Sequence, residues 1–248
     1  MEKFEERFHV RSYNVTDHGV LSPLAMMNYL QESAYQHARR LNLSFHDLRE
    51  KGMLWVLSRI HLALGTLPSW DEVITVRTWP SGMKRLFALR DFEISNGSGK
   101  VFGRAVSAWL AIDGETRRPI RMDRTLGHNF ADIPKVLDTT LDKLPEVENT
   151  DGERLFAVRY RDIDVNGHVN NVSLVEWVIE ALPPETLESA TLAELEVNFL
   201  AEAGRRDDVI SRWRSIDMND GPSYIHSVIR SNDNVELVRA RTIWRKRD

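Results

Sequence analysis

The chain of 248 residues contains no cysteine. A disulfide framework, a thiolate metal site and a cysteine nucleophile are therefore excluded. Basic residues do not outnumber acidic ones, and the formal net charge of −4 gives the chain no general attraction to nucleic acid. The absence of cysteine also fits a reducing compartment, so we expect a cytoplasmic protein.

Long apolar runs are missing as well. No stretch approaches the roughly 18 uninterrupted apolar residues of a membrane helix, so no membrane partner is expected. Residues 1–7 are charged from the start and resemble neither a secretory signal nor an anchor. The sequence shows no glycine-rich phosphate loop and no histidine spacing such as His-Glu-x-x-His, so we expect neither a cofactor nor a metal.

What the chain does contain is one pattern that occurs twice. Residues 10–32 align with residues 158–180 without a gap, and this places Gly19 on Gly167, Tyr29 on Trp177 and Glu32 on Glu180. A helix is predicted near the start of each half. The first begins at Ser22-Pro23, with an apolar stripe at Met27, Leu30, Ala34, Ala38 and Leu41. The second is capped by Asn170 or Asn171, carries a stripe at Val172, Val175, Ile179 and Leu182, and ends before Pro183-Pro184.

Strand-like segments follow each predicted helix. Apolar residues alternate in residues 60–64 and 102–112, and residues 73–79 are rich in β-branched types. In the second half, residues 207–210 echo residues 71–74, and residues 239–244 echo residues 104–109. Residues 95–99 and 231–234 contain the residue types of hairpin turns.

These patterns predict an α+β fold in two halves. We place an N-terminal domain at residues 1–130, a linker at residues 131–153 with a short helix near residues 135–144, and a C-terminal domain at residues 154–248. Each half would be a long helix packed on an antiparallel sheet, which is the hot-dog arrangement. Two in one chain form a tandem hot-dog.

Residues 162–171 read Asp-Ile-Asp-Val-Asn-Gly-His-Val-Asn-Asn. Carboxylates, amides, an imidazole and a glycine in so short a stretch are typical of a loop that enters a helix. Taken singly, Asp164 and Asn166 are ordinary turn formers. His168 would be a packed or solvent-exposed histidine, and Asn170 and Asn171 helix caps. Together they predict a small polar site at the edge of a buried cavity.

This string, followed by Trp177, resembles the motif of the plant fatty acyl-carrier-protein thioesterases and their bacterial relatives. A second landmark, Leu195-Glu196 followed by Glu202-Ala203-Gly204, resembles another segment of that family. The resemblance implies roles for Asp164, Asn166, His168 and Glu202, and an acyl-carrier protein as partner. Ala203 stands where plant members have cysteine. The plant enzymes carry a transit peptide, which residues 1–7 do not resemble, so we expect a bacterial-type member.

Hydrolysis of a thioester without an activated serine or cysteine requires water as the nucleophile. Glu202 or Asp164 is the candidate base, and the choice between them stays open. His168 would be the partner of Glu202, and Asn166 would position the carbonyl with a backbone N–H at the helix start. The aligned first-half residues are Thr16, His18 and Val20. One catalytic half is therefore expected, while the other half supplies the acyl pocket or structure.

Several questions stay open at this point. The carrier could be coenzyme A instead. A hot-dog dehydratase of 3-hydroxyacyl thioesters and a non-catalytic acyl-thioester-binding protein are further alternatives. The quaternary state is open, a homodimer included. An acidic carrier would need a basic patch. The candidates are Arg117, Arg118, Arg121 and Arg124, then Arg205 and Arg206, then residues 245–247.

Overall fold

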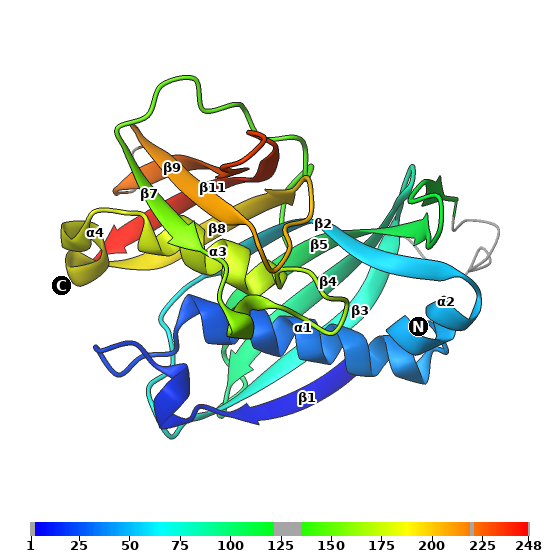
Figure 1. The fold of residues 1–248 in the computed structure, drawn as a ribbon. Helices are drawn as coiled ribbons and strands as arrows, with labels where there is room; N and C mark the ends of the chain where they lie inside the picture. The colour runs from blue at the N-terminus through cyan, green and yellow to red at the C-terminus, as the bar shows by residue number, and fades with distance from the viewer. Residues whose placement is uncertain (1–2, 122–134, 219–220, 248) are drawn as a thin grey trace. The chain divides into compact units, whose positions relative to one another are not determined.

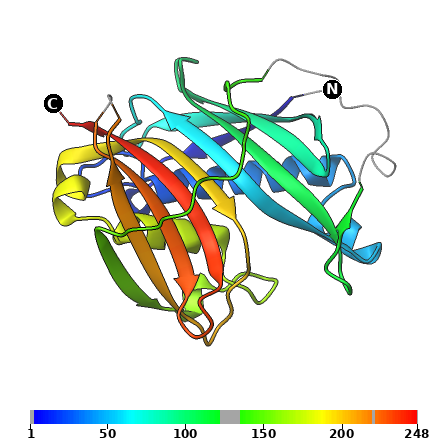
Figure 2. The same ribbon diagram turned by 90° about the horizontal axis from the view of Figure 1, so that it is seen from above.

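The computed structural model describes residues 3–121, 135–218 and 221–247. The chain divides into an N-terminal unit, Met1–Leu141, and a C-terminal unit, Asp142–Asp248. This division falls within the predicted linker. Each unit is an antiparallel sheet with helices packed on it (Figures 1 and 2).

The N-terminal unit contains a long helix and a strongly paired sheet. Its elements are β1 (Phe4–His9), the 3-10 turn η1 (Ser12–Asn14), α1 (Pro23–Arg40), α2 (Phe45–Glu50), β2 (Met53–Leu64), β3 (Val73–Lys84), β4 (Phe87–Asn96), β5 (Val101–Asp113) and β6 (Pro119–Ile120). The strands follow the order β1-β3-β4-β5-β2, with β6 paired to β5. Helix α1 contacts β3 and β1 and so lies against the sheet.

Helix α1 begins where the sequence predicted. The Ser22 hydroxyl accepts from the Ala25 N–H at 3.1 Å, and Pro23 is the first helical residue. Met27, Leu30 and Ala34 of the predicted stripe are buried. Ala38 and Leu41 are only half-buried, and His37 completes the buried stripe in their place.

The C-terminal unit repeats this plan with a shorter helix. Its elements are β7 (Gly152–Ala157), η2 (Tyr160–Asp162), α3 (Asn171–Glu180), α4 (Pro184–Ser189), β8 (Ala190–Phe199), β9 (Asp208–Ile216), β10 (Ser223–Arg230) and β11 (Glu236–Lys246). The strands follow the order β8-β11-β10-β9-β7, and α3 contacts β9 and β10. Strand β7 begins at Gly152, inside the predicted linker.

The prediction of a long helix in each half is correct for the first half alone. Helix α1 has 18 residues, whereas α3 has 10. The predicted stripe on α3 is also partly wrong, because Ile179 is half-buried while Trp177 and Val178 are buried. After α3 ends, Pro184 becomes the first residue of α4, since proline is well tolerated at a helix start.

The internal repeat is confirmed at the level of individual hydrogen bonds. Isolated bridges join Val15 to Leu21 in the first half and Ile163 to Val169 in the second. The aligned glycines, Gly19 and Gly167, have φ values of +72° and +80°, a region that favours glycine. The two halves therefore share one loop conformation at the same place in the pattern.

One of the predicted strand echoes is displaced by a residue. Residues 71–74 were matched to 207–210, which aligns Val73 with Val209. In the structure the Val10 N–H bonds to the Glu72 carbonyl and the Val158 N–H bonds to the Asp207 carbonyl, so Ile74 corresponds to Val209. Both are fully buried, whereas Val73 is exposed. A shift of one residue moves every side chain of a strand to the other face.

The short helix predicted near residues 135–144 is absent, since these residues form neither helix nor strand. Their backbone groups bind side chains instead. The Val136 N–H donates to Asp91 at 3.0 Å, and the Leu144 N–H donates to the Asn198 side chain at 2.7 Å. These longer-range bonds replace the hydrogen bonds of a helix.

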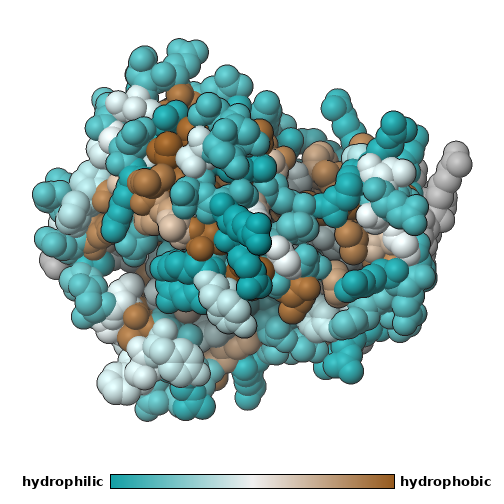
Figure 3. Space-filling model, in the orientation of Figure 1, coloured by the Kyte–Doolittle hydropathy of each residue, from teal (hydrophilic) through white to brown (hydrophobic). Residues whose placement is uncertain are grey.

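None of the helices in the described ranges is long and apolar enough to cross a membrane. Hydrophilic residues cover most of the face seen in Figure 3, with hydrophobic residues in small groups between them. Among the exposed large hydrophobic residues are Tyr160, Val165 and Leu200.

Candidate functional site

The motif forms a tight loop between η2 and α3. The Asp164 N–H donates to the His168 carbonyl at 2.8 Å, and the Gly167 N–H donates to the Asp164 carbonyl at 3.1 Å. Asn170 caps α3, because its side-chain oxygen accepts from the Val172 N–H at 2.8 Å. The loop thus runs directly into the helix, as the sequence predicted.

Asp164 organises the interior of this loop. One carboxylate oxygen accepts from the backbone N–H of Asn166 at 2.8 Å and from that of His168 at 3.3 Å. The other oxygen accepts from the Asn166 side-chain amide at 3.2 Å. The structure therefore brings Asp164 and Asn166 into direct contact, and Asp164 fixes the direction in which the Asn166 amide points.

His168 and Glu202 also come together. The His168 Nε2 lies 3.5 Å from a Glu202 carboxylate oxygen, although the two residues belong to different loops. A backbone bond holds these loops together, since the Val169 N–H donates to the Ala203 carbonyl at 2.9 Å. The four predicted residues thus form two contacting pairs, and a backbone hydrogen bond joins the two loops that carry them.

Arg230 holds the loop that carries Glu202 in place. Its guanidinium donates to the Glu202 carbonyl at 3.0 Å and lies 3.7 Å from the Asp207 carboxylate. Asp207 in turn accepts from the Gly204 N–H at 2.8 Å. Arg230 was not identified from the sequence, because it lies 28 residues from Glu202 and no local pattern links the two.

The site is more open than predicted. About two fifths of each side chain is accessible to solvent, 40% for His168 and 42% for Glu202. Ala203, which stands where the family resemblance implies a cysteine in the plant enzymes, is buried. A mechanism that uses that thiol is impossible in this chain. Water, by contrast, can reach the His168–Glu202 pair directly.

The corresponding loop of the first half lacks these functional groups. The Thr16 N–H donates to the Val20 carbonyl at 2.8 Å, as Asp164 does to His168. Leu21 and Val169 occupy equivalent positions, and their N–H groups bind Pro68 and Ala203, so Leu67 takes the place of Glu202. The repeat therefore preserves the backbone and not the acid–amide–imidazole set.

A second set of charged residues near the motif was not assigned from sequence. Asp162 is fully buried and binds Arg159, which also binds Glu176 of α3. A signal was present, because Arg159 and Asp162 are three residues apart, as are Arg11 and Asn14 in the first repeat. Among the described residues, no group of three His, Asp or Glu side chains is arranged to hold a metal ion.

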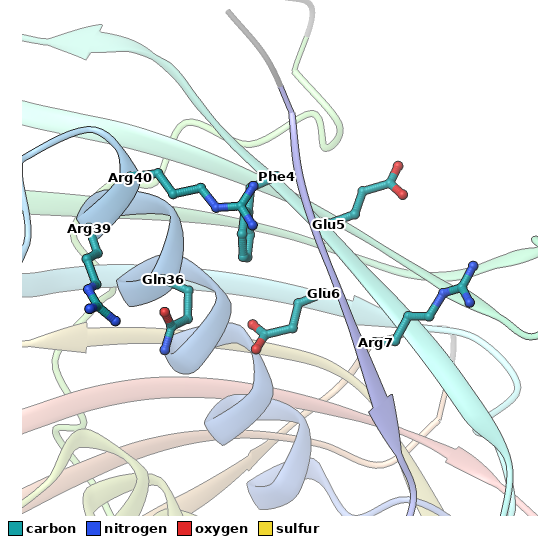
Figure 4. Close-up of a pocket in the computed structure, with 7 residues that line it drawn as sticks. All are labelled: Phe4, Glu5, Glu6, Arg7, Gln36, Arg39 and Arg40. Atoms are coloured by element: carbon teal, nitrogen blue, oxygen red, sulfur yellow. The ribbon is translucent and has the colours of Figure 1, made fainter.

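The N-terminal unit has an open groove between β1 and the last turns of α1 (Figure 4), with a volume of about 580 Å³. It is lined by Phe4, Glu5, Glu6, Arg7, Gln36, Arg39 and Arg40. In Figure 4, Glu5 and Arg7 point away from the helix, while Glu6 faces Gln36. The mixed charges and wide opening suit neither an acyl chain nor the predicted chemistry.

Comparison with known proteins supports both the fold and the family resemblance. A family model for the acyl-ACP thioesterase N-terminal domain matches residues 1–129, and one for the acyl-ACP thioesterase C-terminal domain matches residues 146–246. Chloroplastic palmitoyl-acyl carrier protein thioesterases of Cuphea hookeriana and Gossypium hirsutum are 29% and 30% identical over 99% and 98% of this chain. The chain spans 63% of the length of each of these relatives.

Solved structures agree with this result. The 12:0-ACP thioesterase from Umbellularia californica superposes with a TM-score of 0.88 at 27% identity, covering 99% of this chain and 98% of that one. An acyl-ACP thioesterase from Bacteroides thetaiotaomicron gives a TM-score of 0.86 at 25% identity, covering 98% and 97%. The predicted tandem hot-dog fold is confirmed. Because both family models match in chain order along nearly its whole length, the chain belongs to the acyl-ACP thioesterase family.

Proposed function

We propose that this chain hydrolyses fatty acyl-acyl-carrier-protein thioesters, with water as the nucleophile. The observation that carries the proposal is the His168–Glu202 contact of 3.5 Å, beside the Asn166 amide held by Asp164. An acid–imidazole pair can take a proton from water, and an amide N–H can bind a developing oxyanion.

In the proposed reaction, Glu202 accepts a proton from a water molecule while His168 orients that water or the carboxylate. The water oxygen forms a bond to the thioester carbon, and the carbonyl oxygen becomes negative. The Asn166 amide stabilises this oxyanion, and its orientation depends on Asp164. The carbon–sulfur bond then breaks, and Glu202 returns its proton to the leaving sulfur, which departs as a thiol. The products are a fatty acid and the free carrier thiol.

The two units would have different roles in the reaction. The C-terminal unit carries the reacting groups, and the N-terminal unit would supply the acyl pocket or structure. The absence of the acid–amide–imidazole set from the first-half loop supports one active site per chain. A cytoplasmic location stays a prediction.

We assign carrier docking to Arg205 and Arg206. They follow Glu202 closely in the chain, both are exposed, and neither forms an ion pair among the described residues. The Arg205 guanidinium lies 5.5 Å from the centroid of the exposed Tyr160 ring, which leaves its charge accessible. We rank the other candidate patches lower because they lie farther from Glu202 along the chain. Arg124 lies outside the described residues.

The test is release of free thiol from acyl-carrier-protein and acyl-CoA substrates of several chain lengths. Wild type should hydrolyse the carrier-protein thioester at the higher kcat/KM, and D164A, N166A, H168A and E202A should each lower the rate by roughly 10²-fold or more. A higher kcat/KM for the acyl-CoA substrate would show that coenzyme A, and not the carrier protein, is the carrier. An enone product from a 3-hydroxyacyl substrate would identify a dehydratase, and binding without turnover would identify a binding protein.

A further inference from the structure

A charged network ties the start of the motif loop to α3. The buried Asp162 carboxylate accepts from the Arg159 backbone N–H at 2.7 Å and from its guanidinium at 3.0 Å. The same guanidinium nitrogen donates to Glu176 at 2.8 Å, and Arg161 donates to the same Glu176 oxygen at 2.8 Å. Asp162 and Glu176 together raise the pKa of Arg159, so the guanidinium stays charged.

Asp162 also closes the other end of the loop. Its carbonyl oxygen accepts from the Asn170 N–H at 2.7 Å. Asn170 is the residue that caps α3, while Glu176 lies on the same helix. The buried residue Asp162 thus contacts both ends of the loop, with Arg159 at its start and Asn170 at its end.

The loop between these points has little packing of its own. The Val165 side chain at its tip is 88% exposed, and Asn166 and Gly167 are exposed as well. Loop residues with so few buried contacts move easily unless their ends are held. The backbone closure itself occurs in both halves, since the Ser22 N–H donates to the Asn14 carbonyl at 2.9 Å. In the second half, the positions of Asp164 and His168 depend in addition on how firmly Arg159 holds the buried Asp162 carboxylate at the start of the loop.

The first half shows that the fold itself does not need this network. Asn14 stands at the position of Asp162 and accepts from the Arg11 N–H at 3.1 Å, so the backbone turn is the same. Asn28 stands at the position of Glu176. Within the described ranges, Arg11 forms no ion pair. The arginine therefore occurs in both halves, but it forms the network with two carboxylates only in the half that carries the proposed site.

We propose that Asp162, Arg159 and Glu176 are positioning residues for the acid–amide–imidazole set. This inference rests on the proposed hydrolase function. The network acts through the loop and does not touch the substrate. Its expected effect is on the rate of the chemical step, because misplacement of a reacting group by about 1 Å costs roughly 10²-fold.

The experiment compares D162N with N14A. Asn at position 162 keeps the backbone turn, as Asn14 does, and removes the charge. We expect D162N to lower kcat roughly 10- to 100-fold with KM within about twofold. N14A removes the side chain that accepts from the Arg11 N–H at the equivalent place in the first half. It should lower Tm by about 2–4 °C and leave kcat unchanged.

Imidazole NMR of His168, assigned with an H168Q spectrum, supplies a readout that is independent of turnover. The His168 signal should shift or broaden in D162N and stay in place in N14A. E176Q, at a half-buried surface position, tests the network if D162N does not fold, and a lowered kcat is again expected. Should wild type release no thiol, the hydrolase proposal fails while the NMR result still decides the positioning role. A normal kcat and an unchanged His168 signal in the folded variants would overturn it.

Discussion

The Val169 N–H donates to the Ala203 carbonyl at 2.9 Å, and this bond sets the loop of His168 against the loop of Glu202. Because it joins backbone groups, substitutions of the His168 or Glu202 side chains leave it in place. Rate changes in such variants therefore report on chemistry and not on separation of the two loops.

The first prediction concerns this pair. E202Q keeps the size of the side chain and removes its ability to accept a proton, and H168Q removes the imidazole. Each should lower kcat for thioester hydrolysis roughly 10²- to 10⁴-fold, the usual contribution of general acid–base catalysis. Thiol release at saturating substrate measures the effect. H18Q, in the loop of the first half, is the control and should keep the wild-type rate.

The second prediction concerns stability in acid. Burial lowers the pKa of His226 to about 3, and burial together with Arg90 lowers the pKa of His37 to about 4. Both residues are therefore neutral in the folded protein, whereas the unfolded chain takes up protons below a pKa of about 6.5. Above about pH 6.5, neither histidine makes the free energy of unfolding depend on pH. As the pH falls below it, each should lower the free energy of unfolding by up to about 1.4 kcal/mol per pH unit.

Urea unfolding of H226Q between pH 7 and pH 5 tests this directly. The variant should show a shallower loss of stability with falling pH than wild type, whatever its stability at pH 7. H46Q, at an exposed position, should retain the wild-type slope. Equal slopes in H226Q and wild type would show that His226 does not contribute to acid sensitivity.

The third prediction uses the two equivalent glycines. A Cβ at Gly19 or Gly167 would meet nothing within 4 Å, so G19A and G167A differ from wild type only by backbone strain at positive φ. Each should cost about 1 kcal/mol and lower Tm by about 2–4 °C. G167A alone should also lower kcat, because the strain falls on the loop of Asp164 and His168. Similar activity losses in both variants would argue that stability, and not loop geometry, limits the rate.

The fourth prediction tests carrier docking. Charge reversal in R205E and R206E should raise KM for the acyl-carrier-protein substrate several-fold, since rim charges act mainly on encounter and docking. KM for a small acyl thioester should stay unchanged. R118E, in another candidate patch, is the matched control. An equal effect of R205E on both substrates would reject docking and indicate damage to the site.

The sequence alone predicted the duplicated α+β plan, the start of α1 at Ser22-Pro23 and the capping of α3 by Asn170 or Asn171, of which Asn170 forms the cap. These features depend on local patterns, because caps, turns and strand alternation involve residues that are close in the chain. The family motif also pointed to Asp164, Asn166, His168 and Glu202. Local patterns failed at residues 135–144, where distant side chains of Asp91 and Asn198 replace a helix.

The relations between segments required the tertiary structure. The correspondence of Ile74 with Val209 follows from pairing between strands, and no single segment encodes it. The approach of Glu202 to His168 depends on a backbone bond between two loops. The placement of the buried Asp162 carboxylate at the start of the motif loop depends on Arg159, which also binds Glu176 in a helix. Residue types set the available chemistry, whereas hydrogen bonds between distant segments decided which groups could act together.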